Sequence, residues 1–209
     1  MWIRIFIYGK TAHAGNPLAG DNAICRTMRL INHLDTSMGP ILSKRSSGTK
    51  HSTMNIGKVS GGQNVNVVPG SCTLDIDRRL LPTEDLQQAY QEVCDHLNTS
   101  GEPQNSYETK LVTGTNGFSA PSNGPGVSAL VDAIKTRTDK DPQFVDAVGV
   151  SDGRYFADKK IEIINFGPGN GSTSHAANEY IEVDQMVDAA IILQDTVKRL
   201  TGLRHSPHN

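Results

Sequence analysis

Residues 71–97, SCTLDIDRRLLPTEDLQQAYQEVCDHL, contain the two patterns that decide the fold of this 209-residue chain. Apolar and polar side chains alternate from Cys72 to Arg79, which is typical of a strand with one buried face. The apolar residues of the next segment recur at helical spacing: Leu86, Ala89, Tyr90, Val93 and Leu97. Thr83 is expected to cap this helix, and acidic residues follow it in the first turn. The stretch therefore predicts a strand followed directly by an amphipathic helix.

The same two patterns continue on both sides of this unit. Upstream, residues 2–8 and 52–60 are predicted to be strands, and a helix is expected from about residue 23 to residue 34, capped by Asp21 or Asn22. Residues 41–52 are rich in Ser, Lys and Gly and are expected to form a loop. Downstream, residues 106–112 predict a fourth strand. The order strand, helix, strand, strand, helix, strand is the split β-α-β arrangement, so residues 1–113 are predicted to form a ferredoxin-like domain.

A second unit is expected after residues 114–126, which are rich in Gly, Asn, Ser and Pro. Its pattern predicts helices over 127–138 and 183–200, helical turns over 151–157, and short strands over 144–148 and 161–166. The apolar run 161–166, IEIINF, is typical of a parallel strand buried between helices. Because two strands make an incomplete sheet, residues 114–209 are predicted to be the C-terminal part of an α/β layer whose remainder lies outside this chain.

Composition narrows the class of protein. The 20 basic and 22 acidic residues give a net charge of −2, so no basic field calls for nucleic acid. No apolar run approaches the roughly 20 residues that span a bilayer, and the N-terminus has no signal-peptide pattern. The three cysteines are scattered, which favours free thiols in a reducing compartment. We therefore expect a cytoplasmic protein that binds neither nucleic acid nor membrane.

The candidate functional residues share a place in or beside polar, glycine-punctuated segments: His13, Asn66, Arg79, Asp152, Arg154 and His175. Arginine forks suit carboxylates, and an asparagine or a histidine can stabilise an oxyanion. His175 lies in GPGNGSTSHAANE (167–179), and a neutral imidazole is the commonest ligand of transition metals. These residue types indicate a site for a carboxylate-bearing substrate, with His175 as a candidate metal ligand and Gly167 to Gly169 shaping the pocket.

Five of these residues also have an ordinary structural explanation. The alternatives are an ion pair with Asp77 for Arg79, a turn cap for Asn66 and a bond to its own loop backbone for His13. For Asp152 the alternative is a cap of the following helical turn, and for His175 it is a solvated side chain. Both explanations stay open from pattern alone. The chain has no Gly-x-Ser-x-Gly elbow and no phosphate-binding loop, so the patterns of those two site types are excluded.

Four stretches, taken in order, resemble the zinc aminoacylase superfamily, which includes acetylornithine deacetylase, succinyl-diaminopimelate desuccinylase, aminoacylase and the glutamate carboxypeptidases. They are residues 9–13 (GKTAH) with Pro17 and 20–24 (GDNAI), 61–62 (GG) with 66–69 (NVVP), 77–79 (DRR) with Pro82, and 151–156 (SDGRYF) with 167–169 (GPG), His175 and 178–179 (NE). The first three resemble the lid domain of that family, and the fourth resembles the last part of its catalytic domain.

The resemblance implies a lid that forms homodimers and a catalytic site that hydrolyses the amide bond of N-acyl amino acids or small peptides. That site would hold two zinc ions, with cobalt or manganese as alternatives. His175 would be a zinc ligand, and His13 would polarise the scissile carbonyl across the dimer. The substrate-binding residues would be Asn66, Arg79, Arg154, Gly167 and Gly169.

The chain also departs from the family pattern, because the N-terminal half that carries the other metal ligands is absent from this sequence. One histidine cannot hold a catalytic zinc ion, which takes three protein ligands. The expectation is therefore a fragment of a zinc-dependent amidohydrolase that is inactive alone. The alternative is a non-catalytic dimerisation or binding module that retains the lid fold.

Overall fold

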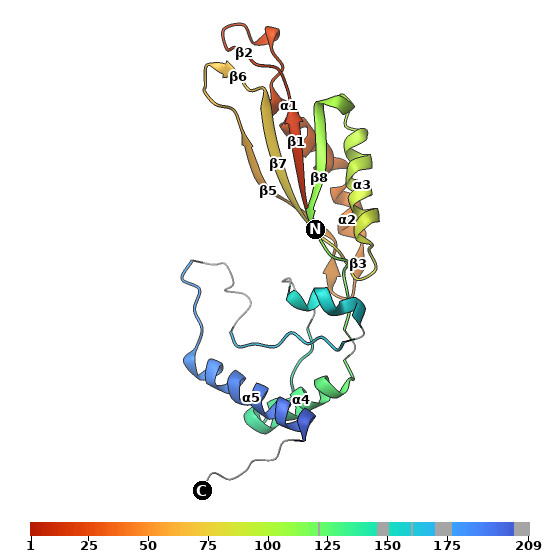
Figure 1. Cartoon of the computed structure of the whole chain (residues 1–209), viewed down its shortest axis with the longest axis vertical. Coiled ribbons are helices and arrows are strands. Elements are labelled where there is room, and N and C mark those ends of the chain that lie inside the picture. Colours follow the sequence, from red (N-terminus) through yellow and green to blue (C-terminus); the bar gives the residue numbers. More distant parts are fainter. Residues whose placement is uncertain (121, 146–150, 160, 170–176, 203–209) are drawn as a thin grey trace. The chain divides into compact units, whose positions relative to one another are not determined.

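The structure, a computed structural model, describes residues 1–120, 122–145, 151–159, 161–169 and 177–202 (Figure 1). His175 and most of the predicted strand 144–148 lie outside the described residues. The chain divides into two compact units, Met1–Phe118 and Ser119–Asn209. Each unit is described by itself.

The first unit is a four-stranded antiparallel sheet with helices on one face (Figure 1). The strands are β1 (Trp2–Tyr8), β5 (Thr53–Gly61), β7 (Ser71–Arg79) and β8 (Tyr107–Thr113), in the order β5-β7-β1-β8. Alternate residues of the two central strands are buried, namely Ile3, Ile5 and Ile7 of β1 and Cys72, Leu74 and Ile76 of β7. They pack beneath α1 (Ala23–Ser37) and α3 (Leu86–Asn98). The ferredoxin-like prediction is confirmed.

Helix α1 starts at the cap that its sequence suggested. The Asn22 side-chain oxygen accepts hydrogen bonds from the backbone N–H groups of Ile24, at 2.9 Å, and Cys25, at 3.1 Å. Asn22, not Asp21, is therefore the cap. An Asx side chain at this position satisfies donors that the first helical turn leaves open.

Two local predictions in the first unit are wrong. Helix α3 is capped by Asp85, not by Thr83, and the Asp85 carboxylate accepts the N–H groups of Gln87 and Gln88. Residues 41–52 are not a loop, because they contain part of α2 (Gly39–Lys44) and the paired strands β3 (Ser46–Ser47) and β4 (Lys50–His51). Helix α2 forms here because Leu42 is buried in the core of the first unit.

The second unit contains α4 (Pro125–Thr138), the 3-10 helix η3 (Asp152–Lys159) and α5 (Val183–Thr201). Leu130 and Ala133 of α4 pack with Ile192 of α5 and with Phe166. The predicted strand 161–166 is not a strand in the structure. Glu162 within it instead caps α4, because its carboxylate accepts the N–H groups of Gly126, at 2.8 Å, and Val127, at 2.9 Å.

Within the described ranges, no helix is both long enough and apolar enough to cross a membrane. The three cysteines, Cys25, Cys72 and Cys94, are free thiols.

Candidate functional site

A short two-stranded arm carries His13 and Asn66 beyond one end of the main sheet (Figure 1). Strand β2 (Ala12–His13) pairs antiparallel with β6 (Val67–Val68), and His13 lies opposite Val67. The next backbone contact is from the Ala14 N–H to the Asn66 carbonyl, at 3.0 Å. The structure therefore brings these two predicted site residues together, and both side chains are exposed.

The His13 ring is oriented by its own loop. The backbone N–H of Gly15 donates to His13 Nδ1 at 3.0 Å, which is the loop-backbone contact that the sequence left open as the ordinary explanation. A backbone N–H can only donate, so Nδ1 is the acceptor, and the proton of a neutral ring must lie on Nε2. Nε2–H has no hydrogen-bond partner in the described part of the chain. The contact therefore presents a donor at the exposed end of the ring.

An open depression of about 520 Å³ lies at the base of this arm. Its walls are mainly apolar with a few amide side chains, and they include Asn22, Ile24, Gln63, Asn64, Val67 and Pro69. His13 does not line it. The candidate donor therefore stands outside this depression rather than inside an enclosed binding cavity.

Arg79 lies at the other end of the first unit. It is the last residue of β7, whereas the β2–β6 arm lies beyond the first residue of that strand. At about 3.3 Å per residue, the eight steps of β7 alone span about 26 Å. The Arg79 guanidinium pairs with Asp77 at 2.8 Å. Within one copy of the first unit, Arg79 is therefore far from His13 and Asn66.

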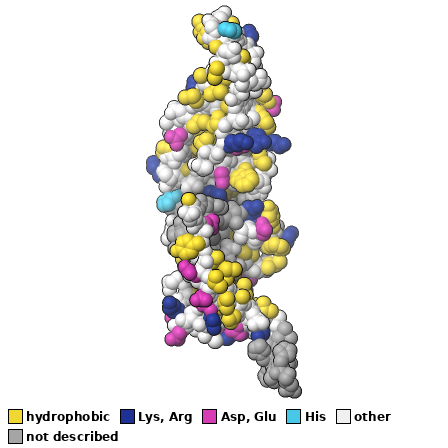
Figure 2. Space-filling view, turned by 90° about the vertical axis from the view of Figure 1, so that its left-hand side faces the viewer, with side chains coloured by type: hydrophobic (Ala, Val, Ile, Leu, Met, Phe, Trp, Pro, Cys, Tyr) yellow, Lys and Arg dark blue, Asp and Glu magenta, His cyan; other side chains and the backbone are white. Residues whose placement is uncertain are grey.

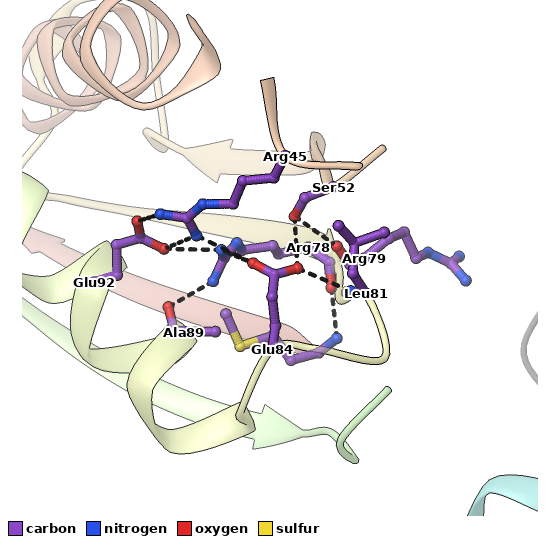
Figure 3. A network of polar contacts seen from close by, with 9 residues as sticks. Arg45, Ser52, Arg78, Arg79, Leu81, Glu84, Ala89 and Glu92 are labelled. Atoms are coloured by element: carbon purple, nitrogen blue, oxygen red, sulfur yellow. Dashed lines mark hydrogen bonds and ion pairs between the residues drawn. The ribbon is translucent and has the colours of Figure 1, made fainter. Parts of the chain in front are cut away.

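Behind Arg79 lies a buried ionic network that the sequence analysis did not anticipate (Figure 3). Arg78 has no solvent exposure. Its guanidinium donates to Glu84 at 2.7 Å, to Glu92 at 2.8 Å and to the Ala89 carbonyl at 2.9 Å. Arg45 pairs with the same two carboxylates. The network lies at the end of the first unit where β7, the loop after it and α3 meet.

The network also fixes the backbone that carries Arg79. Ser52 Oγ lies 3.1 Å from the Arg79 carbonyl oxygen and 3.0 Å from the Glu84 carboxylate, and its hydroxyl can donate to either. Glu84 also accepts a hydrogen bond from the Leu81 N–H at 2.8 Å. Burial lowers the pKa of Arg78. Burial raises the pKa of Glu92, but the hydrogen bond from Arg45 and the neighbouring positive charges together lower that pKa by a larger amount, so the net shift is downward. These contacts stabilise the charged form of Glu92 and give the network a structural role.

The second unit holds the remaining predicted residues. Arg154 lies on η3, where its guanidinium donates to the Tyr155 hydroxyl at 2.8 Å and stacks over the Tyr155 ring. Arg154 Nε and Ser151 Oγ are buried with no hydrogen-bond partner in the described part of the unit. Asp152 is the first residue of η3, whereas a capping residue would precede that helix.

The two glycines of the 167–169 turn differ in their surroundings. Gly169 has φ = +104°, a conformation that disfavours any side chain. Its N–H donates to the Gln185 side chain of α5 at 3.1 Å, so that N–H is already used within the protein. No atom of the described residues lies within 4 Å of a Cβ placed on Gly167. The turn is anchored to α5, and Gly167 is its open position.

The described residues do not by themselves fit a resident metal ion. No group of three His, Cys, Asp or Glu side chains among them lies close enough together to hold one. His175, the expected ligand, is outside those residues. No chemical step through a metal ion is therefore derived from this chain.

Comparison with known proteins identifies a family model and relatives that the chain matches. Residues 1–105 match the family model described as the peptidase dimerisation domain, M20_dimer. The chain is 28% identical over 193 residues to the succinyl-diaminopimelate desuccinylase of Corynebacterium glutamicum, covering 92% of this chain and 50% of that protein. It is 24% identical over 204 residues to the acetylornithine deacetylase of Myxococcus xanthus, covering 95% and 52%.

A solved structure shows the same fold. The M20 family metallo-carboxypeptidase of Sulfolobus solfataricus superposes with a TM-score of 0.66 at 16% identity, covering 97% of this chain and 58% of that one. The chain spans about half the length of the curated relatives that it matches.

Proposed function

Since the chain belongs to the M20 peptidase family through its dimerisation domain, we propose that it supplies the lid and the last part of the catalytic domain of a metal-dependent amidohydrolase. The substrates of that enzyme would be N-acyl amino acids or small peptides. The relatives named as a desuccinylase and a deacetylase support the reaction class. The relative named as a metallo-carboxypeptidase supports a metal cofactor. Zinc, two ions per site, is the metal that we propose.

One observation carries the proposal: the arm presents His13 Nε2–H as an exposed donor while Nδ1 is held by Gly15. Amide hydrolysis adds water to the carbonyl carbon, develops negative charge on the carbonyl oxygen and then breaks the C–N bond to give a carboxylate and an amine. A donor fixed in direction stabilises that oxygen. We propose this role for His13, with Asn66 beside it as a substrate contact.

The next proposed substrate contacts are positively charged side chains, which suit a negatively charged carboxylate. We propose that Arg79 and Arg154 bind the substrate carboxylate, since a guanidinium fork matches two carboxylate oxygens. The Arg154 Nε that lacks a partner in the described unit supports this role. Arg79 would exchange Asp77 for the substrate. Gly167 and Gly169 would line the pocket, and His175 would be a metal ligand.

The proposal includes a homodimer formed through the lid. The family model describes this domain as one of dimerisation, and β5 is an edge strand that can pair with another chain. The wide separation of His13 from Arg79 within one lid supports a site built from two copies. We also place the protein in the cytoplasm, where three free thiols are expected to persist.

The test combines this chain with the part of the Corynebacterium glutamicum desuccinylase that it does not align with, in the presence of zinc. We expect hydrolysis of an N-succinyl amino acid by the mixture and by neither polypeptide alone. His13→Ala should lower the rate about 10²- to 10³-fold, whereas Lys10→Ala, two residues before β2, should not. A mixture that forms a complex but releases no amine, or a His13→Ala mixture as active as the wild type, would contradict the proposal.

A second candidate is a non-catalytic dimerisation or binding module. It is favoured by the family match, which covers the dimerisation domain alone, and by the lack of a metal-ligand cluster in the described ranges. This candidate predicts a dimer that gains no hydrolytic activity in any such mixture.

A further inference from the structure

Helix α5 carries an apolar face that the rest of the second unit leaves uncovered. Ala189, Ile192 and Thr196 are its buried residues, and they face α4. A different set is exposed and repeats with the spacing 3-4-3-4-3: Val183, Met186, Ala190, Leu193, Val197 and Leu200. We call this set the α5 stripe. Such spacing keeps side chains on one side of a helix.

The stripe is long and free of charge. From residue 183 to residue 200 it extends about 26 Å at 1.5 Å per residue. Its five larger side chains are each between 47% and 71% exposed. The charged residues of α5 all lie on another face: Asp184, Asp188, Asp195, Lys198 and Arg199. Three of them already form ion pairs, Asp188 with Arg137 of α4 and Asp195 with Arg199 along the helix.

Other apolar side chains of the second unit are exposed as well. Tyr180 and Ile181, directly before α5, are exposed, as are Ile161 and Ile164 of the IEIINF segment. Hydrophobic side chains are accordingly visible on the surface of the second unit in Figure 2. Apolar exposure on this scale marks an interaction surface.

The flanks of the stripe argue against a second copy of α5 as its occupant. In a two-stranded coiled coil, the positions beside the apolar seam usually carry charges that set the pairing. Here one flank is Val187, Gln194 and Thr201, and the other is turned toward α4. A wide apolar face with all charge on the opposite side is typical of a helix that packs on the core of a larger layer.

The relatives named above contain about as much further chain as this chain covers. Their alignments cover 92% and 95% of this chain but only 50% and 52% of the relatives' own length. We infer that the α5 stripe is the docking face for the polypeptide that corresponds to the uncovered half of these relatives. The inference rests on the proposed function for the identity of that half, but the contact itself does not depend on catalysis.

The test uses the full chain and the unaligned part of the Corynebacterium glutamicum desuccinylase, expressed separately and mixed. Binding is measured by sedimentation velocity for the wild type, Leu193→Asp and the matched control Ile191→Asp. Ile191 is an exposed aliphatic residue of the same helix that lies off the stripe. Circular dichroism checks that both variants keep their helices, since neither side chain belongs to the buried face toward α4.

We expect a one-to-one complex for the wild type and for Ile191→Asp, and at least tenfold weaker binding for Leu193→Asp. An independent readout is oxidation of Met186 by dilute peroxide, which should be fast in the chain alone and slowed in the complex. No binding by the wild type, equal binding by all three proteins, or Met186 protected by self-association of the chain alone would overturn the inference. A complex that forms through the stripe yet does not hydrolyse N-succinyl amino acids would support the docking face and count against the proposed function.

Discussion

Replacing Arg78 by methionine tests whether the buried network holds the base of the first unit together. The substitution keeps an unbranched side chain of similar length and removes the charge. It deletes the contacts of Arg78 with Glu84, Glu92 and the Ala89 carbonyl. The two carboxylates, which are only 10% and 21% exposed as side chains, then keep Arg45 as their shared ion-pair partner.

The expected loss can be set from these contacts. Removing one partner of a buried ion pair costs about 3–5 kcal/mol, because the other charge is left buried without compensation. Two features reduce that loss here: Arg45 remains beside both carboxylates, and Arg78 Nε has no partner in the described unit to lose. We therefore expect the free energy of unfolding to fall by about 3 kcal/mol at pH 7.

Urea unfolding provides the assay. Trp2 is the only tryptophan of the chain and lies in β1, so its fluorescence reports on the first unit. The control is Arg4→Met, which breaks an ion pair with Asp75 on the exposed face of the sheet and should cost much less. Adding Glu84→Gln to Arg78→Met should recover part of the loss, because it removes one of the two uncompensated charges. An Arg78→Met variant no less stable than Arg4→Met would refute the reasoning.

Two further predictions concern acid stability and helix capping. Arg4 lowers the pKa of Asp75 through its hydrogen bond, and Arg45 contributes to the net lowering of the pKa of Glu92. Because these carboxylates have lowered pKa values in the folded state, they contribute stability above their ordinary pKa values of 3.8 and 4.5, and this stability is lost as the pH falls through the folded-state values. The urea midpoint should therefore stay constant from pH 7 to about pH 5 and decrease below about pH 4. Asn22→Ala should cost about 1 kcal/mol in the same assay while Asn22→Ser costs less; equal midpoints for the two variants would contradict the capping assignment.

The fold of the first unit could be predicted because its local patterns and its tertiary packing agree. Alternation in 71–79 gives the strand, and the periodic apolar residues that follow give α3. Prediction failed where a distant contact decided the local structure. Thr83 is a good cap by residue type, but Glu84 turns inward to Arg78, and the cap is Asp85, two residues after Thr83.

The candidate site could be predicted only in part, for a related reason. The arm that presents His13 and Asn66 was signalled by glycines and by polar residues, which mark turns. The buried network was not recognised, although alternation contained the signal: Arg78 is in phase with Cys72, Leu74 and Ile76, which face the core. Arg79 is out of phase with them and faces outward. A charged residue at an inward position requires partners, and those come from residues 45, 84 and 92, which no local pattern links.

The positions of His13 and Arg79 constrain any site that uses both. Arg79 is the last residue of β7, and the arm that carries His13 lies beyond the first residue of that strand, which spans about 26 Å within the four-stranded sheet. No movement of the β2–β6 arm about its own base closes that distance, because the arm is only a few residues long. If both residues contact one N-acyl amino acid, they must therefore come from different copies of the chain. The geometry of a single lid therefore supports the proposed dimer, since a monomer would hold the proposed oxyanion donor and the proposed carboxylate-binding arginine too far apart for one substrate to reach both.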